Sequence, residues 1–291
     1  MEQTQFGIFQ LAQSLYPLLE DEYEKDGFPY CKHCNTARFC KIDRGEIEPP
    51  FIVRVRCECQ QKEAKAKEEE ELRQKRLEDF RRRQKLSMIG DKYLNATFDT
   101  ATITKHNEQA YESARAYVKQ AQAVLSNNIG LYIYGDNSSG KTYLIACICN
   151  ALVEKGYSCE FTSIPKLLAE TGRNARENRM SQAEIVDNLA RKNFVFIDDL
   201  GKEFLGDRSD YNWKKAERLL LDVLNARYSN GLPTVFTSNY SLEEFAEKFG
   251  LDKAIIERVN EMATRVIKLD GDNFRMIALQ EKMQLAKKLG I

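Results

Sequence analysis

The residues best suited to carry out chemistry form a short loop, GDNSSGKT (135–142), bounded by two glycines. An apolar run precedes the loop and another follows it, so it joins a predicted strand to a predicted helix. In that context the spacing G-x-x-x-x-G-K-[ST] indicates a phosphate-binding P-loop. The glycines let backbone N–H groups turn toward a polyphosphate, and the helix adds the positive end of its dipole. We expect the phosphates to be held by Gly135, Asn137, Ser138, Ser139, Gly140, Lys141, Thr142 and Tyr143.

A second candidate group follows the apolar run FVFI (194–197) as two adjacent carboxylates, Asp198 and Asp199. A parallel strand buried on both faces is typically such a run, and ligands bind beyond the carboxyl ends of parallel strands. Lys141 would reach the β- and γ-phosphates, while Thr142 and Asp198 would hold Mg²⁺. Asp199 would orient or activate the attacking water. The alternative for the two carboxylates is a capped strand end.

A third strand, PTVFTSN (233–239), ends in Asn239. Its amide could hydrogen-bond the γ-phosphate or the lytic water. It could also cap the helix that is predicted to begin at Ser241. The sequence leaves both interpretations open.

Five of the eight cysteines lie between residues 31 and 59. A C-x-x-C pair places two thiolates on one side of a metal, and a second pair can complete a tetrahedral Zn²⁺ site. The predicted zinc ligands are Cys31, Cys34, Cys57 and Cys59. The closing pair is C-x-C, and Cys40 and His33 are possible substitutes. The alternative is a set of reduced structural cysteines.

The composition of the whole chain limits its class. It has 291 residues, 43% of them hydrophobic and 30% charged, with a net charge of zero. This balance excludes a global electrostatic attraction to nucleic acid. No apolar run is long enough for a membrane span and no basic leader begins the chain, so we expect a cytoplasmic protein without membrane contact. Thiols stay reduced there, which favours a metal over disulfides.

The predicted elements divide the chain into a zinc-binding domain over 1–60, a charged helical linker over 61–90 and an ATPase-type α/β domain over 91–291. Residues 1 to about 27 have apolar residues at helical spacing, for an amphipathic helix that packs on its own domain or docks a partner. Residues 62–85 are dense in charge, which favours a solvated helix over contact with nucleic acid. The cysteines at 147, 149 and 159 lie in apolar surroundings and are expected in the core.

In the α/β domain we expect a parallel sheet flanked by helices. Its further predicted elements are a strand over 158–163, a helix over 165–170, a loop over 173–179, helices over 213–230 and 252–262, and a closing hairpin formed by 265–269 and 274–279.

The ordered set GDNSSGKT (135–142), FVFIDDLG (194–201), NARYSNGLPTVFTSN (225–239) and ERVNEM (257–262) resembles the AAA+ ATPases. Within these P-loop NTPases of the ASCE type, it is similar to the DnaC/DnaI-type replicative helicase loaders, with the IstB transposition helpers as close relatives. An N-terminal cysteine module before a charged linker resembles the loader branch, which includes bacterial and phage-encoded proteins.

The resemblance implies further residue roles. Asp198 and Asp199 match the Walker B pair, and Asn239 matches the sensor-1 position. Arg258 matches the arginine finger that a neighbouring subunit inserts against the γ-phosphate, with Arg227 as a second candidate and a helix-surface arginine as the alternative. No sensor-2 arginine is clear, and Arg275 is assigned no role.

The function implied is an ATP-dependent loader. Its N-terminal module would bind a hexameric DnaB-type replicative helicase, and ATP, with Mg²⁺, would assemble its AAA+ domains around single-stranded DNA. Hydrolysis to ADP would depend on that oligomer and would release or reset the loader at replication initiation. The alternatives are an IstB-like ATPase that assists a transposase, and a nucleotide-binding adaptor or inhibitor of the helicase.

Overall fold

The computed structural model describes residues 17–42, 51–177, 180–271 and 273–289. The chain divides into one unit that ends at Glu78 and a second that begins at Asp79. Each unit is described by itself. In the described part of the chain, no helix is long and apolar enough to cross a membrane.

A parallel sheet forms the centre of the second unit, and its strands come from the continuous apolar runs of the sequence. The strand order is β6-β7-β8-β5-β9, and every neighbouring pair is parallel. The strands are β5 (Leu131–Tyr134), β6 (Cys159–Thr162), β7 (Phe194–Leu200), β8 (Thr234–Ser238) and β9 (Arg265–Lys268). Because all five point the same way, their carboxyl ends meet at one edge of the sheet.

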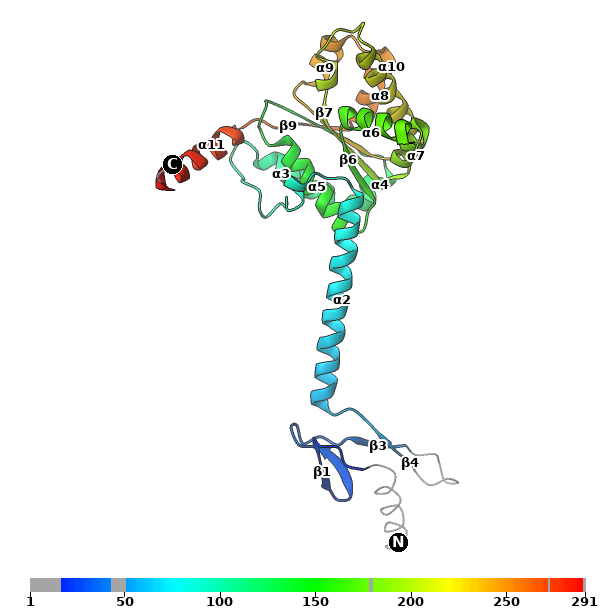
Figure 1. The fold of residues 1–291 in the computed structure, drawn as a ribbon, viewed down its shortest axis with the longest axis vertical. Helices are drawn as coiled ribbons and strands as arrows, with labels where there is room; N and C mark the ends of the chain where they lie inside the picture. The colour runs from blue at the N-terminus through cyan, green and yellow to red at the C-terminus, as the bar shows by residue number, and fades with distance from the viewer. Residues whose placement is uncertain (1–16, 43–50, 178–179, 272, 290–291) are drawn as a thin grey trace. The chain divides into compact units, whose positions relative to one another are not determined.

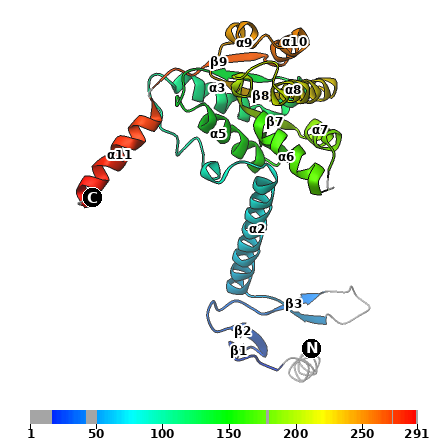
Figure 2. The ribbon, with the colours of Figure 1, turned by 45° about the horizontal axis from the view of Figure 1, so that its top comes forward.

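Helices cover both faces of this sheet (Figures 1 and 2). One face packs against α3 (Glu108–Lys119), α4 (Ala121–Ser126) and α5 (Lys141–Glu154). The other packs against α6 (Ile164–Glu177), α7 (Gln182–Arg191), α8 (Tyr211–Ser229), α9 (Leu242–Phe249) and α10 (Lys253–Met262). Two short 3₁₀ helices, η1 (Asp91–Tyr93) and η2 (Lys202–Phe204), and the C-terminal α11 (Phe274–Leu289) complete the unit. The predicted α/β fold, a parallel sheet flanked by helices, is confirmed.

The first unit holds two antiparallel hairpins and the start of a long helix. The first hairpin pairs β1 (Glu22–Lys25) with β2 (Phe28–Cys31), and the second pairs β3 (Phe39–Ile42) with β4 (Phe51–Arg54). The helix α2 (Glu58–Leu86) begins in this unit and ends in the second. Its residues are almost all exposed, so the predicted helix is confirmed, and its role as a linker stays a prediction.

Three predictions of secondary structure differ from the structure. The closing hairpin is wrong, because β9 pairs with β5 in parallel and 274–289 is helical; the Leu, Met, Lys, Glu and Gln of that segment are strong helix formers. The loop over 173–179 is wrong up to Glu177, where α6 ends. The N-terminal amphipathic helix lies mostly outside the described residues, and its described end, Glu22–Lys25, is a strand.

Other predictions are confirmed. The helix over 213–230 is α8, the helix that starts at Ser241 is α9, and the helix over 252–262 is α10. The cysteines at 147, 149 and 159 are buried in the core.

A buried carboxyl group lies directly after β7. Oε2 of Glu203 accepts a hydrogen bond from the backbone N–H of Gly201 at 3.1 Å, and its Oε1 has no hydrogen-bond partner. Burial raises the pKa of Glu203 to about 7. The protonated acid is therefore the form that the fold favours.

We predict that this group makes stability depend on pH. Since the folded pKa is raised above the ordinary value of 4.5 for a glutamate, the free energy of unfolding falls as the pH rises from about 4.5 to about 7, by roughly 3 kcal/mol. Glu203→Gln should remove this fall, and the exposed Glu247→Gln should retain it. Urea unfolding at pH 5 and pH 8 measures the difference, and equal pH dependence in both variants would contradict the assignment.

A buried arginine ties together several elements on the α8 face. The side chain of Arg227 is fully buried, and burial lowers its pKa to about 9. Nη1 donates to the carbonyls of Leu189 and Lys192 at 2.8 and 2.7 Å, and Nε donates to Oγ1 of Thr234 at 3.0 Å. Arg227 therefore satisfies carbonyls at the end of α7 and holds that end beside the start of β8.

We expect Arg227→Met to lower the free energy of unfolding by roughly 3 kcal/mol or more, because several buried acceptors lose their donor. Arg218→Met, an exposed position on the same helix, should cost less than about 0.5 kcal/mol. Urea unfolding of the two variants beside the parent checks this, and a similar loss in both would contradict it.

Candidate nucleotide and metal sites

The P-loop lies between β5 and α5, at the carboxyl edge of the sheet. Gly135 passes so close to the backbone that an added Cβ would lie 2.2 Å from the carbonyl oxygen of Leu269. Gly140, at φ 96°, is the residue before the first turn of α5. Both positions therefore require glycine. The Oγ atom of Ser139 is buried without a hydrogen-bond partner, as expected for a loop that binds a further polar group.

Lys141 is folded back onto its own loop. Its Nζ donates to the carbonyls of Gly135 and Asp136, each at 2.8 Å. The side chain is buried, and burial lowers its pKa, while the nearby charges of Asp199 and Asp198 act in the opposite direction. The ammonium group thus occupies the mouth of the P-loop and can exchange two carbonyls for phosphate oxygens.

Asp198 accepts hydrogen bonds from the first turn of α5 and from β8. Oγ1 of Thr142 donates to its two carboxylate oxygens at 3.1 and 3.2 Å, and Oγ1 of Thr237 donates to Oδ1 at 2.6 Å. Burial raises the pKa of Asp198, and the hydrogen bond from Thr237 opposes this. A hydroxyl and a carboxylate in contact supply the oxygen ligands that Mg²⁺ prefers. The predicted pair, Thr142 and Asp198, fits the ion.

Asp199 lies at an irregularity of β7. Its φ is +61°, in the left-handed region, and the strand's register shifts between Ile197 and Leu200. Its backbone N–H donates to Thr237 Oγ1 at 2.8 Å, and its carboxylate pairs with Lys202 at 3.3 Å. The Thr237 hydroxyl therefore holds both Walker B residues, a role that the sequence analysis did not assign. Its place in a strand that ends beside β7 was the available signal.

Asn239 follows β8 at the same edge of the sheet. It does not cap the next helix, because Ser241 is the N-cap of α9 and forms a capping box with Glu244. This removes the alternative that the sequence left open, and the sensor-1 role stays a prediction.

The first residue of α11 contacts the P-loop, which the sequence analysis missed. The backbone N–H of Phe274 donates to the Ser138 carbonyl at 3.1 Å. A Cβ added to Gly140 would lie 3.4 Å from the Phe274 ring, so the ring packs against this glycine. The positive charge of the next residue, Arg275, contributes to the lowered pKa of Lys141, although Arg275 itself is exposed.

Arg258 lies on the surface formed by α8 and α10. Its guanidinium is 3.7 Å from the centroid of the Tyr228 ring, Nε donates to Asn225 Oδ1 at 3.2 Å, and Nη1 pairs with Glu261 at 2.6 Å. The side chain is 31% exposed. The second finger candidate, Arg227, is wrong, because it is fully buried and bonded to backbone carbonyls of its own domain.

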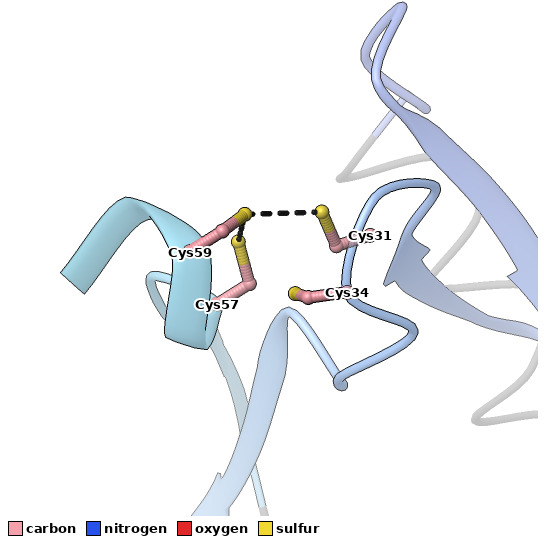
Figure 3. A group of neighbouring side chains, drawn as sticks. All are labelled: Cys31, Cys34, Cys57 and Cys59. Atoms are coloured by element: carbon pink, nitrogen blue, oxygen red, sulfur yellow. Dashed lines mark hydrogen bonds between the residues drawn. The ribbon is translucent and has the colours of Figure 1, made fainter. Parts of the chain in front are cut away.

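Four cysteine sulfurs converge in the first unit (Figure 3). They all lie within 4.8 Å of one another, with Cys59 Sγ 3.6 Å from Cys31 Sγ and 3.1 Å from Cys57 Sγ. A tetrahedral Zn²⁺ with bonds of about 2.3 Å requires S···S distances of about 3.8 Å. The group comprises the four predicted ligands, Cys31, Cys34, Cys57 and Cys59, and it contains neither Cys40 nor His33.

Local backbone structure positions the two sulfur pairs. Cys31 ends β2, and the N–H of Asn35 donates back to the Cys31 carbonyl at 3.0 Å, which closes the turn that carries Cys34. The other pair lies at the N-terminus of α2. The Thr36 hydroxyl, which hydrogen-bonds the Cys34 sulfur, is the main cause that lowers the pKa of Cys34 to about 5, and the backbone N–H of Cys59 is the second. The backbone N–H of Cys34 lowers the pKa of Cys31. These shifts favour the thiolate form of Cys31 and Cys34, whereas the hydrogen bond with Cys57 and burial raise the pKa of Cys59.

Comparison with known proteins adds a family. The family model described as IstB-like ATP binding protein matches residues 64–283. The replicative helicase loader DnaI of Bacillus subtilis (strain 168) is 28% identical over 62% of this chain and 59% of its own length. The replicative helicase loader DnaC of Escherichia coli (strain K12) is 23% identical over 62% of this chain and 69% of its own. The chain thus spans about three fifths of DnaI.

Solved structures share the fold. A primosome component from Streptococcus pyogenes serotype M3 is 28% identical, with a TM-score of 0.51 over 64% of this chain and 92% of its own. A crystal structure of the DnaC helicase loader has a TM-score of 0.51 at 22% identity, over 62% of this chain and all of its own. Since the family model spans most of the chain, this protein belongs to the IstB-like ATP-binding proteins, AAA+ ATPases of the DnaC/DnaI type.

Proposed function

We propose that this protein is an ATP-dependent loader that binds a hexameric DnaB-type replicative helicase and delivers it onto single-stranded DNA. The observation that supports this most is the constellation of Lys141, Thr142 and Asp198 at one edge of the sheet, in a chain similar to two replicative helicase loaders. We further propose a cytoplasmic location, where the helicase acts and cysteines stay reduced.

The site residues have separate roles in hydrolysis. The P-loop amides and Lys141 bind the phosphates, and Thr142 and Asp198 hold Mg²⁺, which neutralises developing charge on the phosphates when bound. Asp199 orients the attacking water, for which its carboxylate must leave Lys202. Asn239 contacts the γ-phosphate or that water. The product would be ADP and phosphate.

The cysteine group has a structural role in the same proposal. Cys31, Cys34, Cys57 and Cys59 bind Zn²⁺ and join the first hairpin to the start of α2. Closed four-thiolate sites contribute folding energy, and a unit this small has little apolar core. The zinc-bound domain over 1–60 would dock the helicase, the segment 61–90 would link it, and 91–291 would form the AAA+ domain.

An IstB-like ATPase that assists a transposase is the second candidate, and the family match itself favours it. The same nucleotide chemistry would then serve a different partner. A third possibility is an adaptor or inhibitor that binds nucleotide without turnover. The partner and the turnover therefore need to be measured on one sample.

We predict that the purified protein forms a stable complex with a replicative helicase and hydrolyses ATP in its presence and that of single-stranded DNA. Lys141→Ala should reduce turnover to background, because no other group of the loop replaces the ammonium charge. Light scattering after size exclusion gives the mass of the complex, and phosphate release gives the rate. ATP binding without any helicase complex would redirect the function to the transposase class, and turnover that persists in Lys141→Ala would contradict the site.

We predict that Arg258 acts on the nucleotide of a neighbouring copy. Its contacts with Tyr228, Asn225 and Glu261 all come from α8 and α10, so the guanidinium is oriented before any partner arrives. In the assembled sample, Arg258→Ala should lower the stimulated ATPase rate by at least about 100-fold, since fingers in other NTPases contribute about 10³ to 10⁵.

A mixing experiment separates this role from a local one. Lys141→Ala subunits retain Arg258, so adding them to Arg258→Ala subunits should restore part of the activity that neither variant shows alone. Lys253→Ala, an exposed position on the same helix, serves as the matched control and should keep the parent rate. Unchanged ATPase in Arg258→Ala, or no recovery on mixing, would show that Arg258 is not a finger in trans.

A further inference from the structure

One arginine of the first unit is buried against the cysteine group. The side chain of Arg38 is only 2% exposed, although burying a guanidinium is costly unless it is paired. It forms ion pairs with Asp21 and, at 3.2 Å, with Glu22. Its Nη2 also lies 3.9 Å from Cys31 Sγ. The charge thus lies between two carboxylates and a metal-ligand sulfur.

The backbone around Arg38 is fixed from both hairpins. Its N–H donates to the Pro29 carbonyl in β2, and its carbonyl accepts from Val55 directly after β4, both at 2.9 Å. When the Gln60 amide is oriented with its oxygen toward the guanidinium, it accepts from Nη1 and Nη2 at 3.2 and 2.9 Å. These contacts leave Arg38 little freedom to turn away from the sulfurs.

The same network holds a second cation, so two carboxylates pair with two arginines. Glu22, whose side chain is fully buried, also pairs with Arg54. Four thiolates around one Zn²⁺ leave about two negative charges, and Cys31 and Cys57 are buried. A buried anionic centre is stabilised by a nearby cation and by N–H donors to its sulfurs. Arg38 supplies such a donor, with its Nη2 3.9 Å from Cys31 Sγ, and Asp21 and Glu22 hold the guanidinium in that place.

We propose that Arg38 is a positioning residue of the zinc centre: it donates to Cys31 and couples metal binding to the β1–β2 hairpin through Asp21 and Glu22. This inference rests on the proposed zinc site. It predicts that zinc affinity depends on a residue that is not a ligand.

Arg54 provides a matched control within the same network. It pairs with the same carboxylate, Glu22, but its side chain is 27% exposed. Among the described residues, its hydrogen bonds go to Glu22 and the Pro17 carbonyl, not to sulfur. Loss of Arg54 therefore disturbs the hairpin and leaves the metal ligands untouched.

The test uses the full chain and its Arg38→Met, Arg38→Lys and Arg54→Met variants. Zinc content gives the stoichiometry, and competition with a chromophoric chelator gives the affinity. Substitution of cobalt for zinc adds absorption bands in the visible range and thiolate-to-cobalt charge-transfer bands. Both report the geometry of a tetrahedral four-sulfur site. At saturating cobalt these bands also show that a variant still folds around the metal.

We expect Arg38→Met to weaken zinc binding about 10- to 100-fold, the range for residues that hydrogen-bond metal ligands, and to shift the thiolate-to-cobalt band. Arg38→Lys should recover part of the affinity, because lysine keeps the positive charge but lacks the planar set of N–H donors of a guanidinium. Arg54→Met should stay within about 3-fold of the parent. Equal affinity of Arg38→Met and the parent, or an equal loss in Arg54→Met, would overturn the role of Arg38. A parent protein that binds no zinc would instead remove the centre itself, and the inference with it.

Discussion

The parallel pairing of β7, β8 and β5 is the constraint on which the nucleotide site depends. Because these strands run in one direction, the residues that follow them meet at the carboxyl edge of the sheet, although they come from distant parts of the sequence. The Asp198 carboxylate is the clearest product of this arrangement, since it accepts from Thr142 after β5 and from Thr237 in β8. Burial also raises the pKa of Asp198, so its ionised form is costly without a nearby cation. A bound Mg²⁺ would supply that cation.

The cysteine group follows a different physical logic. The unit that carries it is built from two short hairpins and the first turns of α2, and such elements bury little apolar surface. Buried charged groups take the place of such a core: Arg38, whose Nη2 lies 3.9 Å from Cys31 Sγ, pairs with the buried Glu22 and with Asp21. Buried charges of this kind persist only when each has a partner, and this requirement ties the hairpin to the sulfurs more specifically than apolar packing could.

Burial separates the two arginines that the sequence offers as an arginine finger, Arg227 and Arg258. Arg227 lies in α8 and Arg258 lies in α10, and their residue type does not distinguish them. The structure buries Arg227 completely among backbone carbonyls, whereas Arg258 stacks on Tyr228 at the surface of α8 and α10. Only an arginine whose guanidinium reaches solvent can contact another copy.

The sequence by itself determined the P-loop, the Walker B strand, the α/β class and the choice of four cysteines, because each depends on residues close together or on apolar runs with a fixed period. It did not determine the C-terminal segments: an apolar run such as 265–269 is compatible with a hairpin or with a parallel edge strand, and only pairing with β5 selected the latter. Only the tertiary structure brings Thr237 to the Walker B pair, Phe274 to the P-loop and Arg38 to the sulfur of Cys31. Their partners lie on other strands or loops, and spacing along the chain carries no information about neighbours across a sheet or around a buried charge.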